Sequence, residues 1–199
     1  MTEATTLRDI AGMGSTPNAL ADSTLILIDC QNTYRRGVMQ LAGVEDALVE
    51  ARRLLERARA LGVPVIHIQH DGGAGSPYDV DADIGRIADP VAPTGSEAII
   101  RKQYPNSFVG TDLHDHLQKL GATSLVLAGF MTHMCVNSTA RGAFNLGYAV
   151  TVVGDATATR ALPSAGGKVI PAQVVHDTSL AAIGDLFGVV VGSTADIAG

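Results

Sequence analysis

Short apolar runs alternate with longer segments of helical periodicity along most of the chain. In the helical segments, apolar residues recur every three or four positions with charged residues between them. This spacing predicts helices over 44–61, 112–120, 135–146 and 172–186. The apolar runs are rich in β-branched residues and predict strands over 24–28, 63–70, 99–102, 124–129, 149–153 and 189–191.

Strands that alternate with helices need crossover connections, which leave the strands parallel and place helices on both faces of the sheet. We therefore predict an α/β fold with a doubly wound, mostly parallel six-stranded sheet in three Rossmann-like layers.

Residues 1–22 lack steady periodicity and are predicted to form an N-terminal arm with one short helical turn, which could pack on a partner subunit. Residues 23–199 are predicted to form a single domain, because a chain of 199 residues can bury about 70% of its unfolded surface. The segment 71–95 is rich in glycine and proline and is predicted to be a substrate-side loop or lid.

Charge and composition exclude several classes of function. A net charge of −6, with 14 basic and 20 acidic residues, argues against a nucleic-acid partner and leaves small neutral or cationic substrates open. No apolar run approaches the ~18 residues that a membrane span needs. Two cysteines, and a start without the pattern of a signal peptide, predict a reduced, cytoplasmic protein. A hydrophobic share of 46% beside 17% charged residues predicts a homo-oligomer, a dimer or higher.

Three polar residues stand at the edge of the predicted sheet where ligands bind in open parallel folds. Asp29 and Lys102 lie at the ends of two predicted strands, and Cys135 stands at the start of a predicted helix. The unpaired N–H groups and the dipole of a helix N-terminus favour a thiolate, which makes Cys135 a candidate nucleophile. Each residue also has an ordinary interpretation: a turn-forming Asp, a solvated Lys and a packing Cys. Strand alternation turns Cys30 away from Asp29 and predicts a structural role for it.

Three ordered motifs around these residues resemble those of the isochorismatase-like (cysteine hydrolase) superfamily. The first, DCQNTY from Asp29, is similar to the family's DxQNDF, and the second joins Lys102 to the Ser–Phe–x–Gly–Thr run at 107–111. The third, GFMTHMCVNSTA at 129–140 with a Gly–Tyr pair at 147–148, is similar to G-x-x-T-D-x-C-V-x-x-T-A…G-Y. Isochorismatases that cleave a vinyl ether lack the cysteine, so its presence here points to the amidohydrolase branch.

The resemblance implies a catalytic triad of Asp29, Lys102 and Cys135. Asp29 would accept the thiol proton and later return it to the leaving nitrogen, while Lys102 would keep Asp29 ionised and favour the thiolate. Cys135 would form an acyl thioester that water then hydrolyses. The resemblance also implies an oxyanion hole from the main-chain N–H groups of Met131 and Cys135, and a non-proline cis peptide bond between Phe130 and Met131. The expected substrate is a small-molecule amide, lactam or carbamoyl compound, and no cofactor is expected.

Four further residues are candidates for binding the substrate: Tyr34, Gln69, Phe108 and His133. His133 occupies a position where the family often has Asp. The wall of the pocket is therefore expected to differ from that of other members, while the triad is retained.

The nicotinamidase branch of the superfamily holds a metal ion with an Asp-x-His pattern and further histidines. Here the corresponding strand carries His67, Gln69 and His70, and alternation places the first two on one face and the third on the other. We therefore expect structural or pocket-lining histidines and no metal site. The alternatives are a metal-dependent nicotinamidase-type amidase, a non-catalytic ligand-binding member of the same fold and a cysteine redox sensor.

Overall fold

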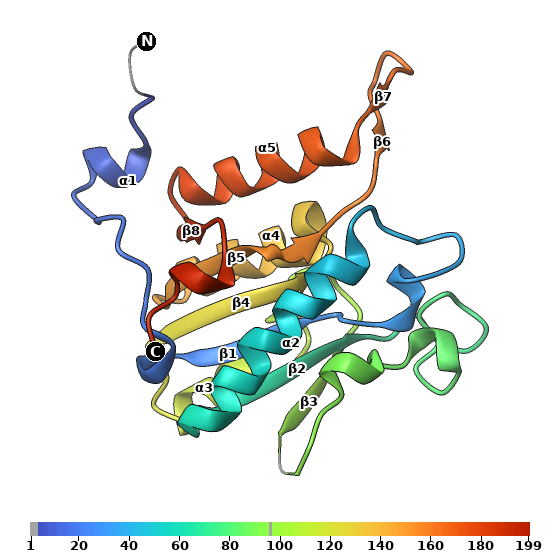
Figure 1. Cartoon of the computed structure of the whole chain (residues 1–199), viewed down its shortest axis with the longest axis horizontal. Helices are drawn as coiled ribbons and strands as arrows, with labels where there is room; N and C mark the ends of the chain where they lie inside the picture. The colour runs from blue at the N-terminus through green and yellow to red at the C-terminus, as the bar shows by residue number, and fades with distance from the viewer. Residues whose placement is uncertain (1–3, 96) are drawn as a thin grey trace.

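The computed structural model describes residues 4–95 and 97–199. In this part of the chain, six strands form one sheet in the order β3-β2-β1-β4-β5-β8, with every neighbouring pair parallel (Figure 1). These strands are β1 (Thr24–Ile28), β2 (Val65–His70), β3 (Ala98–Lys102), β4 (Ser124–Phe130), β5 (Ala149–Ala158) and β8 (Val189–Val191). The helices are α1 (Leu7–Ile10), α2 (Val44–Leu61), α3 (Leu113–Lys119), α4 (Asn137–Asn145) and α5 (Ala172–Gly184). The predicted doubly wound α/β class is confirmed.

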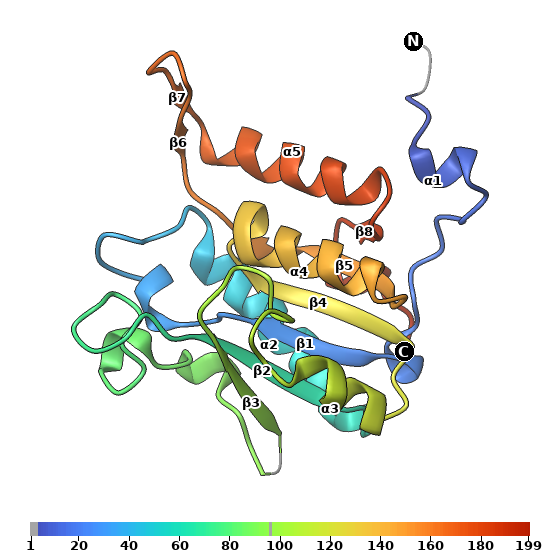
Figure 2. The same ribbon diagram turned by 180° about the vertical axis from the view of Figure 1, so that it is seen from behind.

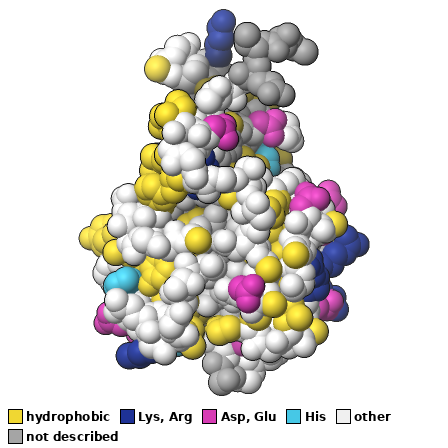
Figure 3. All heavy atoms as spheres, turned by 90° about the vertical axis from the view of Figure 1, so that its left-hand side faces the viewer, with side chains coloured by type: hydrophobic (Ala, Val, Ile, Leu, Met, Phe, Trp, Pro, Cys, Tyr) yellow, Lys and Arg dark blue, Asp and Glu magenta, His cyan; other side chains and the backbone are white. Residues whose placement is uncertain are grey.

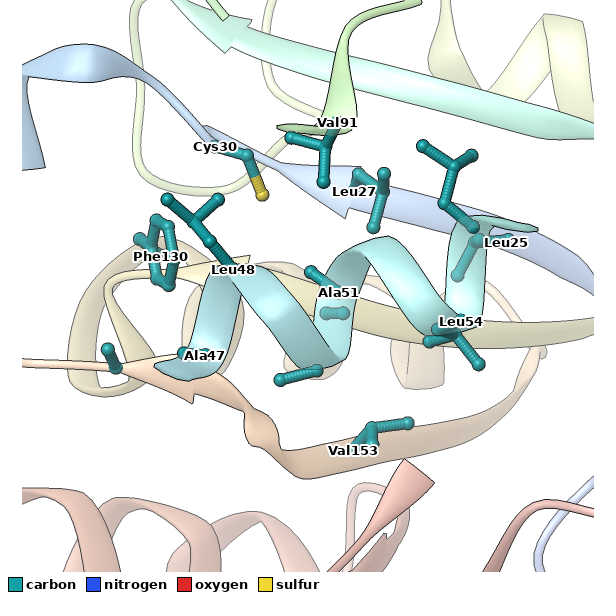
Figure 4. Packing of buried hydrophobic residues seen from close by; sticks show 14 of the residues in the cluster. Leu25, Leu27, Cys30, Ala47, Leu48, Ala51, Leu54, Val91, Phe130 and Val153 are labelled. Atoms are coloured by element: carbon teal, nitrogen blue, oxygen red, sulfur yellow. The ribbon is translucent and has the colours of Figure 1, made fainter. Parts of the chain in front are cut away.

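Helices cover both faces of the sheet, and the central strand β1 is therefore buried throughout. Leu25 and Leu27 point to the face that α2 covers, where Figure 4 shows them opposite apolar residues of that helix. Ile26 and Ile28 belong to the core on the opposite face, together with residues of α3, α4 and α5 (Figure 2). Cys30 packs in the first of these cores and is 2% exposed, which confirms its predicted burial.

Helix α2 has the bounds that the periodicity predicts. It ends at Gly62, whose φ of 69° lies in the left-handed region that glycine adopts without a steric penalty. The Gly62 N–H donates to the carbonyls of Ala58 and Arg59, and the chain then turns directly into β2. The C-terminal end of this helix is therefore set by a local signal in the sequence.

Strand β5 is longer than predicted. The expected end at residue 153 is wrong, because the strand continues to Ala158. Leu127 pairs with Val152 and Gly129 with Thr157, so β5 carries a bulge between these two pairs. The residues that suggested a turn lie within this bulge, and beyond it β5 again runs beside the end of β4.

Two further predictions of secondary structure need correction. The helix expected from Cys135 starts instead with a π-helical turn over Thr132–Val136, and α4 follows from Asn137. The segment after β5, predicted to be a loop, contains a short hairpin of β6 (Leu162–Pro163) and β7 (Val169–Ile170). This hairpin projects from the body of the molecule next to the start of α5 (Figure 1).

The N-terminal arm is fastened to the end of α5 in the same chain. The N–H of Leu7 donates to Asp185 Oδ1 at 3.0 Å, and the N–H of Arg8 donates to the Asp185 carbonyl at 2.9 Å. The Arg8 guanidinium adds a bond to the carbonyl of Leu186 at 3.2 Å. These contacts attach the arm to the end of α5 in its own chain, and its packing on a partner subunit stays a prediction. Among the described residues, no helix has the length and apolar character that crossing a membrane requires.

Candidate active site

Asp29 follows the last residue of β1 in an unusual backbone conformation. Its φ is +49°, the left-handed region, which non-glycine residues seldom occupy. The Asp29 N–H donates to the carbonyl of Ile68 at 2.9 Å, and the Asp29 carbonyl accepts from Gln31 at 2.7 Å. The residue is fully buried. These contacts hold the carboxylate at the carboxyl edge of the sheet, where the sequence places it.

Gly129 lets the nucleophile turn approach Asp29 closely. Its φ is +115°, and a Cβ atom at this position would lie 2.0 Å from the carbonyl oxygen of Ile28. No residue with a side chain could bring the ends of β1 and β4 together in this way. A glycine is therefore required at this position of the third motif, because the ends of β1 and β4 lie too close together for a side chain.

Lys102, the last residue of β3, reaches across to both other members of the predicted triad. Its Nζ lies 2.7 Å from Asp29 Oδ2 and 3.3 Å from Cys135 Sγ. A third contact, 3.2 Å long, joins Nζ to His70 Nδ1. The ammonium group of Lys102 thus forms an ion pair with a carboxylate oxygen and hydrogen bonds with a sulfur and a ring nitrogen. Because Nζ must donate, His70 Nδ1 is the acceptor. The structure therefore brings together the three residues for which the resemblance implies a triad.

Cys135 lies inside the π-helical turn, with 5% of its surface exposed. The carbonyl of Met131 accepts hydrogen bonds from the N–H groups of Met134 at 3.0 Å and Val136 at 3.2 Å, which closes the turn. The peptide bond between Phe130 and Met131 is cis, as the resemblance implies. The main-chain N–H groups expected to form the oxyanion hole, those of Met131 and Cys135, belong to this same turn.

The electrostatics of the site differ from the sequence-based expectation that the helix N-terminus and Lys102 favour the thiolate of Cys135. Burial, followed by the charge of Asp29, raises the pKa of Cys135 to about 12, and Lys102 only partly opposes this. Burial also raises the pKa of Asp29 against the lowering effect of Lys102. The pKa of Lys102 is reduced by burial but raised overall by the charges of Asp29 and Cys135. Lys102 therefore lies between a buried carboxyl group and a thiol whose pKa is raised, because a thiolate would place a second negative charge beside Asp29.

The predicted substrate-binding residues divide into two groups. Tyr34 is 1% exposed and packs edge-on against Phe130, with ring centroids 5.8 Å apart. His133 is half-buried beside the nucleophile, and its Nδ1 makes a hydrogen bond with Thr159 Oγ1. Both therefore border the turn that carries Cys135.

The other two predicted residues make contacts that support the fold. The Gln69 amide donates to the carbonyl of Gly85 at 2.9 Å and so fastens the 71–95 segment. The ring of Phe108 stacks on Tyr148, at a centroid distance of 5.9 Å, and packs against the core formed with α3 and α4. The structure therefore shows no contact that supports substrate binding by Gln69 or Phe108, because each side chain already contacts other parts of the fold.

Tyr78 is a wall residue that the sequence reasoning missed. It comes from the middle of the 71–95 segment, and its ring lies edge-on to His70 at 4.9 Å and to Tyr34 at 5.8 Å. The glycine- and proline-rich composition of the 71–95 segment predicted a substrate-side loop. It did not indicate that the side chain of Tyr78 points toward the site. That segment therefore supplies part of the wall around Lys102 and its partners.

The histidines of β2 do not fit a metal site next to Cys135. His67 Nε2 lies 3.0 Å from Glu97 Oε2, and His70 Nδ1 is occupied by Lys102. Burial lowers the pKa of both histidines. Among residues 4–95 and 97–199, no three His, Cys, Asp or Glu side chains are grouped as metal ligands. The prediction of structural or pocket-lining histidines agrees with these contacts.

Comparison with known proteins supplies independent evidence on the family. The isochorismatase domain profile matches residues 23–195. A secreted isochorismatase effector, Isc1, of Verticillium dahliae is 35% identical over 187 residues, covering 94% of this chain and 96% of its own. A streptothricin hydrolase of Streptomyces noursei is 34% identical over 163 residues, which are 81% of this chain and 65% of that enzyme.

A solved structure extends the match to three dimensions. The crystal structure of an isochorismatase from Pseudomonas putida KT2440 superposes with a TM-score of 0.94 at 38% identity, over 98% of this chain and all of that one. Together with the domain match and the assembled Asp29, Lys102 and Cys135, this shows that the chain belongs to the isochorismatase family of hydrolases.

Proposed function

We propose that this protein is a cysteine-dependent hydrolase that cleaves the C–N bond of a small-molecule amide, lactam or carbamoyl compound. The observation that carries the proposal is the contact of Lys102 Nζ with both Asp29 Oδ2, at 2.7 Å, and Cys135 Sγ, at 3.3 Å. These contacts place a thiol, a carboxylate and a cation in one buried group. The slight exposure of Cys135 favours a small substrate.

In the first half of the reaction, Asp29 accepts the proton of Cys135 as the sulfur attacks the carbonyl carbon of the substrate. The C–S bond forms while the carbonyl π bond becomes an oxyanion. Asp29 then gives the proton to the departing nitrogen, the C–N bond breaks, and an acyl thioester remains on Cys135. Because the thiol is protonated at rest, activation is a proton transfer that accompanies attack.

In the second half, Asp29 takes a proton from a water molecule, which attacks the thioester carbonyl. The C–S bond breaks, the acid is released, and the proton returns to the sulfur. Lys102 stabilises the negative charge that passes between Asp29 and Cys135. The N–H groups of Met131 and Cys135 would hold the oxyanion, and one such donor is worth roughly 3–4 kcal/mol.

The decisive experiment combines a substrate screen with trapping of the covalent intermediate. Small amides, ureas and lactams are incubated with the protein, and intact mass then detects an acyl group on Cys135. Cys135→Ala and Asp29→Asn should each reduce hydrolysis by at least about a thousandfold while circular dichroism remains unchanged. The nucleophile and the general base are both needed for the same step, so the loss of either one stops it. Cys30→Ala is the matched control and should retain activity, since that thiol packs in the core. Substantial turnover by either triad variant would overturn the mechanism.

The compartment of the protein is a separate proposal. Both cysteines are buried free thiols in the structure, which is compatible with a reducing compartment such as the cytoplasm. The Verticillium relative is named as secreted. Fractionation of the producing cells, followed by immunodetection, separates the two locations.

A further inference from the structure

His70 shares the carboxyl edge of the sheet with Lys102, although the three motifs do not include it. It is the last residue of β2, and it pairs in register with Lys102, the last residue of β3. Side chains at paired positions of neighbouring parallel strands point to the same face of the sheet. Here they meet, with 3.2 Å between His70 Nδ1 and Lys102 Nζ. The imidazole is therefore in direct contact with the ammonium group that joins Asp29 to Cys135.

The surroundings of His70 hold its ring in this position. Gln31 is fully buried, and its side-chain amide binds the main chain of His70 on both sides. Its Oε1 accepts from the His70 N–H at 2.9 Å, and its Nε2 donates to the His70 carbonyl at 3.0 Å. The Tyr78 ring lies edge-on to the imidazole, with 4.9 Å between the ring centroids. A fixed main chain and a packed ring make His70 Nδ1 a preorganised acceptor.

The contact with Lys102 determines which ring nitrogen of His70 carries the proton. An ammonium nitrogen only donates, so Nδ1 is the unprotonated nitrogen and the ring proton lies on Nε2. The charged groups that face the ring are Lys102 of β3, Asp29 beyond β1 and Asp71, the next residue in the chain. Burial, followed by the charge of Lys102, lowers the pKa of His70, and Asp29 and Asp71 only partly oppose this. The imidazole is therefore neutral near pH 7 and able to accept.

Lys102 depends on this acceptor because its side chain is completely buried. A buried N–H donor that loses its acceptor costs free energy, so the ammonium group would turn or move to recover a partner. Of its three contacts, the one to Cys135 Sγ at 3.3 Å is the longest, and sulfur is a weak acceptor. A displaced Nζ would therefore lose the sulfur before it lost the carboxylate of Asp29.

We propose that His70 is a positioning residue for Lys102: the neutral imidazole accepts one N–H of the ammonium group and thereby keeps another directed at Cys135 Sγ. His70 thus supports the negative charge that the sulfur gains during attack, and it does so through Lys102. Its role in hydrolysis rests on the proposed function, whereas its effect on the reactivity of Cys135 does not. This gives a definite task to a histidine for which the sequence predicted only a structural or pocket-lining role.

The first test measures how fast iodoacetamide alkylates Cys135 at pH 9, by peptide mass spectrometry. The charge of Lys102 lowers the pKa of Cys135, so a misplaced ammonium group leaves less thiolate to displace the iodide. His70→Leu occupies the space of the ring without an acceptor and should slow labelling by about fivefold, on the basis that one pKa unit is a factor of ten in thiolate. His70→Asn places an amide oxygen near the position of Nδ1 and should restore most of the rate.

The same substitution in a Lys102→Met background separates positioning from packing. If His70 acts through Lys102, His70→Leu should then leave the labelling rate within about 1.5-fold, because the group to be positioned is gone. His114→Leu is the matched control. It removes another half-buried imidazole with one side-chain hydrogen bond, to the Tyr148 hydroxyl at 2.9 Å, and should leave labelling unchanged. Circular dichroism and Tm verify that each variant folds.

The second test observes the imidazole itself by NMR. The ring nitrogen shifts of His70, assigned by their loss in His70→Asn, distinguish the two neutral tautomers. We expect the Nε2–H tautomer at pH 8. The pKa of His70 should lie below its ordinary value of 6.5 and should rise in Lys102→Met, since the charge that lowers it has been removed. This readout needs neither turnover nor labelling.

An Nδ1–H tautomer at pH 8 would disprove the proposal, because the ring would then offer a donor to an ammonium group. Equal labelling of wild type and His70→Leu, or an Asn variant as slow as the Leu variant, would also disprove it. So would a fivefold slowing by His70→Leu in the Lys102→Met background, which would indicate packing alone.

The proposed function and this inference can fail separately. If the substrate screen finds no hydrolysis while labelling and NMR behave as expected, the hydrolase proposal fails and the positioning of Lys102 stands. If a substrate is found and His70→Leu hydrolyses it with the kcat of the wild type, the inference fails and the hydrolase stands. Support for both is a lower kcat with little change in KM for His70→Leu, and recovery of kcat in His70→Asn.

Discussion

At the scale of single residues, the site depends on one cation shared among three partners. Removing polar groups from water is costly, and the cost is offset because Lys102 forms an ion pair with Asp29 and hydrogen bonds with Cys135 and His70. The same arrangement keeps the thiol protonated, since Asp29 already balances the ammonium charge. Burial and the charge of Asp29 are the largest causes of the raised pKa of Cys135.

This charge arrangement predicts that Asp29→Asn speeds alkylation of Cys135 while abolishing hydrolysis. The Asp29 charge raises the pKa of Cys135, so its removal lowers that pKa and increases the thiolate fraction at a given pH. Iodoacetamide labelling at pH 8 should be about tenfold faster or more, on the basis that one pKa unit is a factor of ten in thiolate.

The pH profile provides the control for this prediction. With a pKa of about 12, labelling of wild-type Cys135 should rise without a plateau from pH 7 to pH 10. Lys102→Met should move the rate in the opposite direction, because the Lys102 charge lowers the pKa of Cys135. A plateau near pH 8 in the wild type would indicate a low-pKa thiol and contradict this account.

At the scale of elements, Glu97 ties three segments together at the start of β3. Its carboxylate accepts from Arg59 of α2 at 2.7 Å, contacts His67 of β2 at 3.0 Å and accepts from the N–H of Thr94 at 2.9 Å. The side chain is 13% exposed, so these contacts are partly shielded from water. They position β3, and therefore Lys102 at its far end.

Glu97→Gln should destabilise the protein by about 1–3 kcal/mol at pH 7, because it weakens a charge-assisted pair that is largely buried. Arg59, followed by other contacts, lowers the pKa of Glu97 from 4.5 to about 2. A depressed folded-state pKa contributes stability above pH 4.5 and loses it as the pH falls toward 2. The difference between wild type and variant, measured by urea unfolding, should therefore shrink between pH 4.5 and pH 2.

Glu45→Gln is the matched control for this measurement. Glu45 pairs with Arg35 at 2.8 Å, but its side chain is 59% exposed, so its loss should change stability by less than about 0.5 kcal/mol. Equal effects of the two substitutions, or a Glu97 effect independent of pH, would show that the cluster does not position β3.

At the scale of the whole molecule, apolar side chains remain on the surface around α5. Val174 of α5 is 50% exposed, and Val169 of the projecting hairpin is 72% exposed. A two-stranded hairpin has little stability in water unless something packs against it. Figure 3 shows that hydrophobic side chains also reach the surface at the end of the molecule where the N-terminal arm lies. We propose that a second copy of the chain covers the face formed by α5 and the β6–β7 hairpin.

Sedimentation velocity should accordingly give a dimer or larger assembly at micromolar concentration. Val174→Lys should weaken that assembly by about tenfold or more, since a buried valine contributes roughly 1.5 kcal/mol. Val49→Lys changes a valine of α2 that is equally exposed, at 50%, and should have no effect. A wild-type protein that sediments as a monomer at all concentrations would exclude the proposed interface.

Much of the fold could be predicted because its signals are local. The bounds of α2 follow from its periodicity and from Gly62, and the apolar run of β1 follows from burial on both faces. The triad could be predicted because its members end strands or follow them, and parallel strands bring their carboxyl ends to one edge. The bulge in β5 and the hairpin after it could not, because both depend on pairing with segments that are distant in sequence.

By itself, the sequence determined the layers of the fold and the three candidate residues at the sheet edge, since periodicity and strand ends can be read along the chain. Only the tertiary structure decided the raised pKa of Cys135 and the ion pair between Lys102 and Asp29. A pKa and an ion pair are set by burial and by neighbours from other elements, and no single stretch of sequence contains that information.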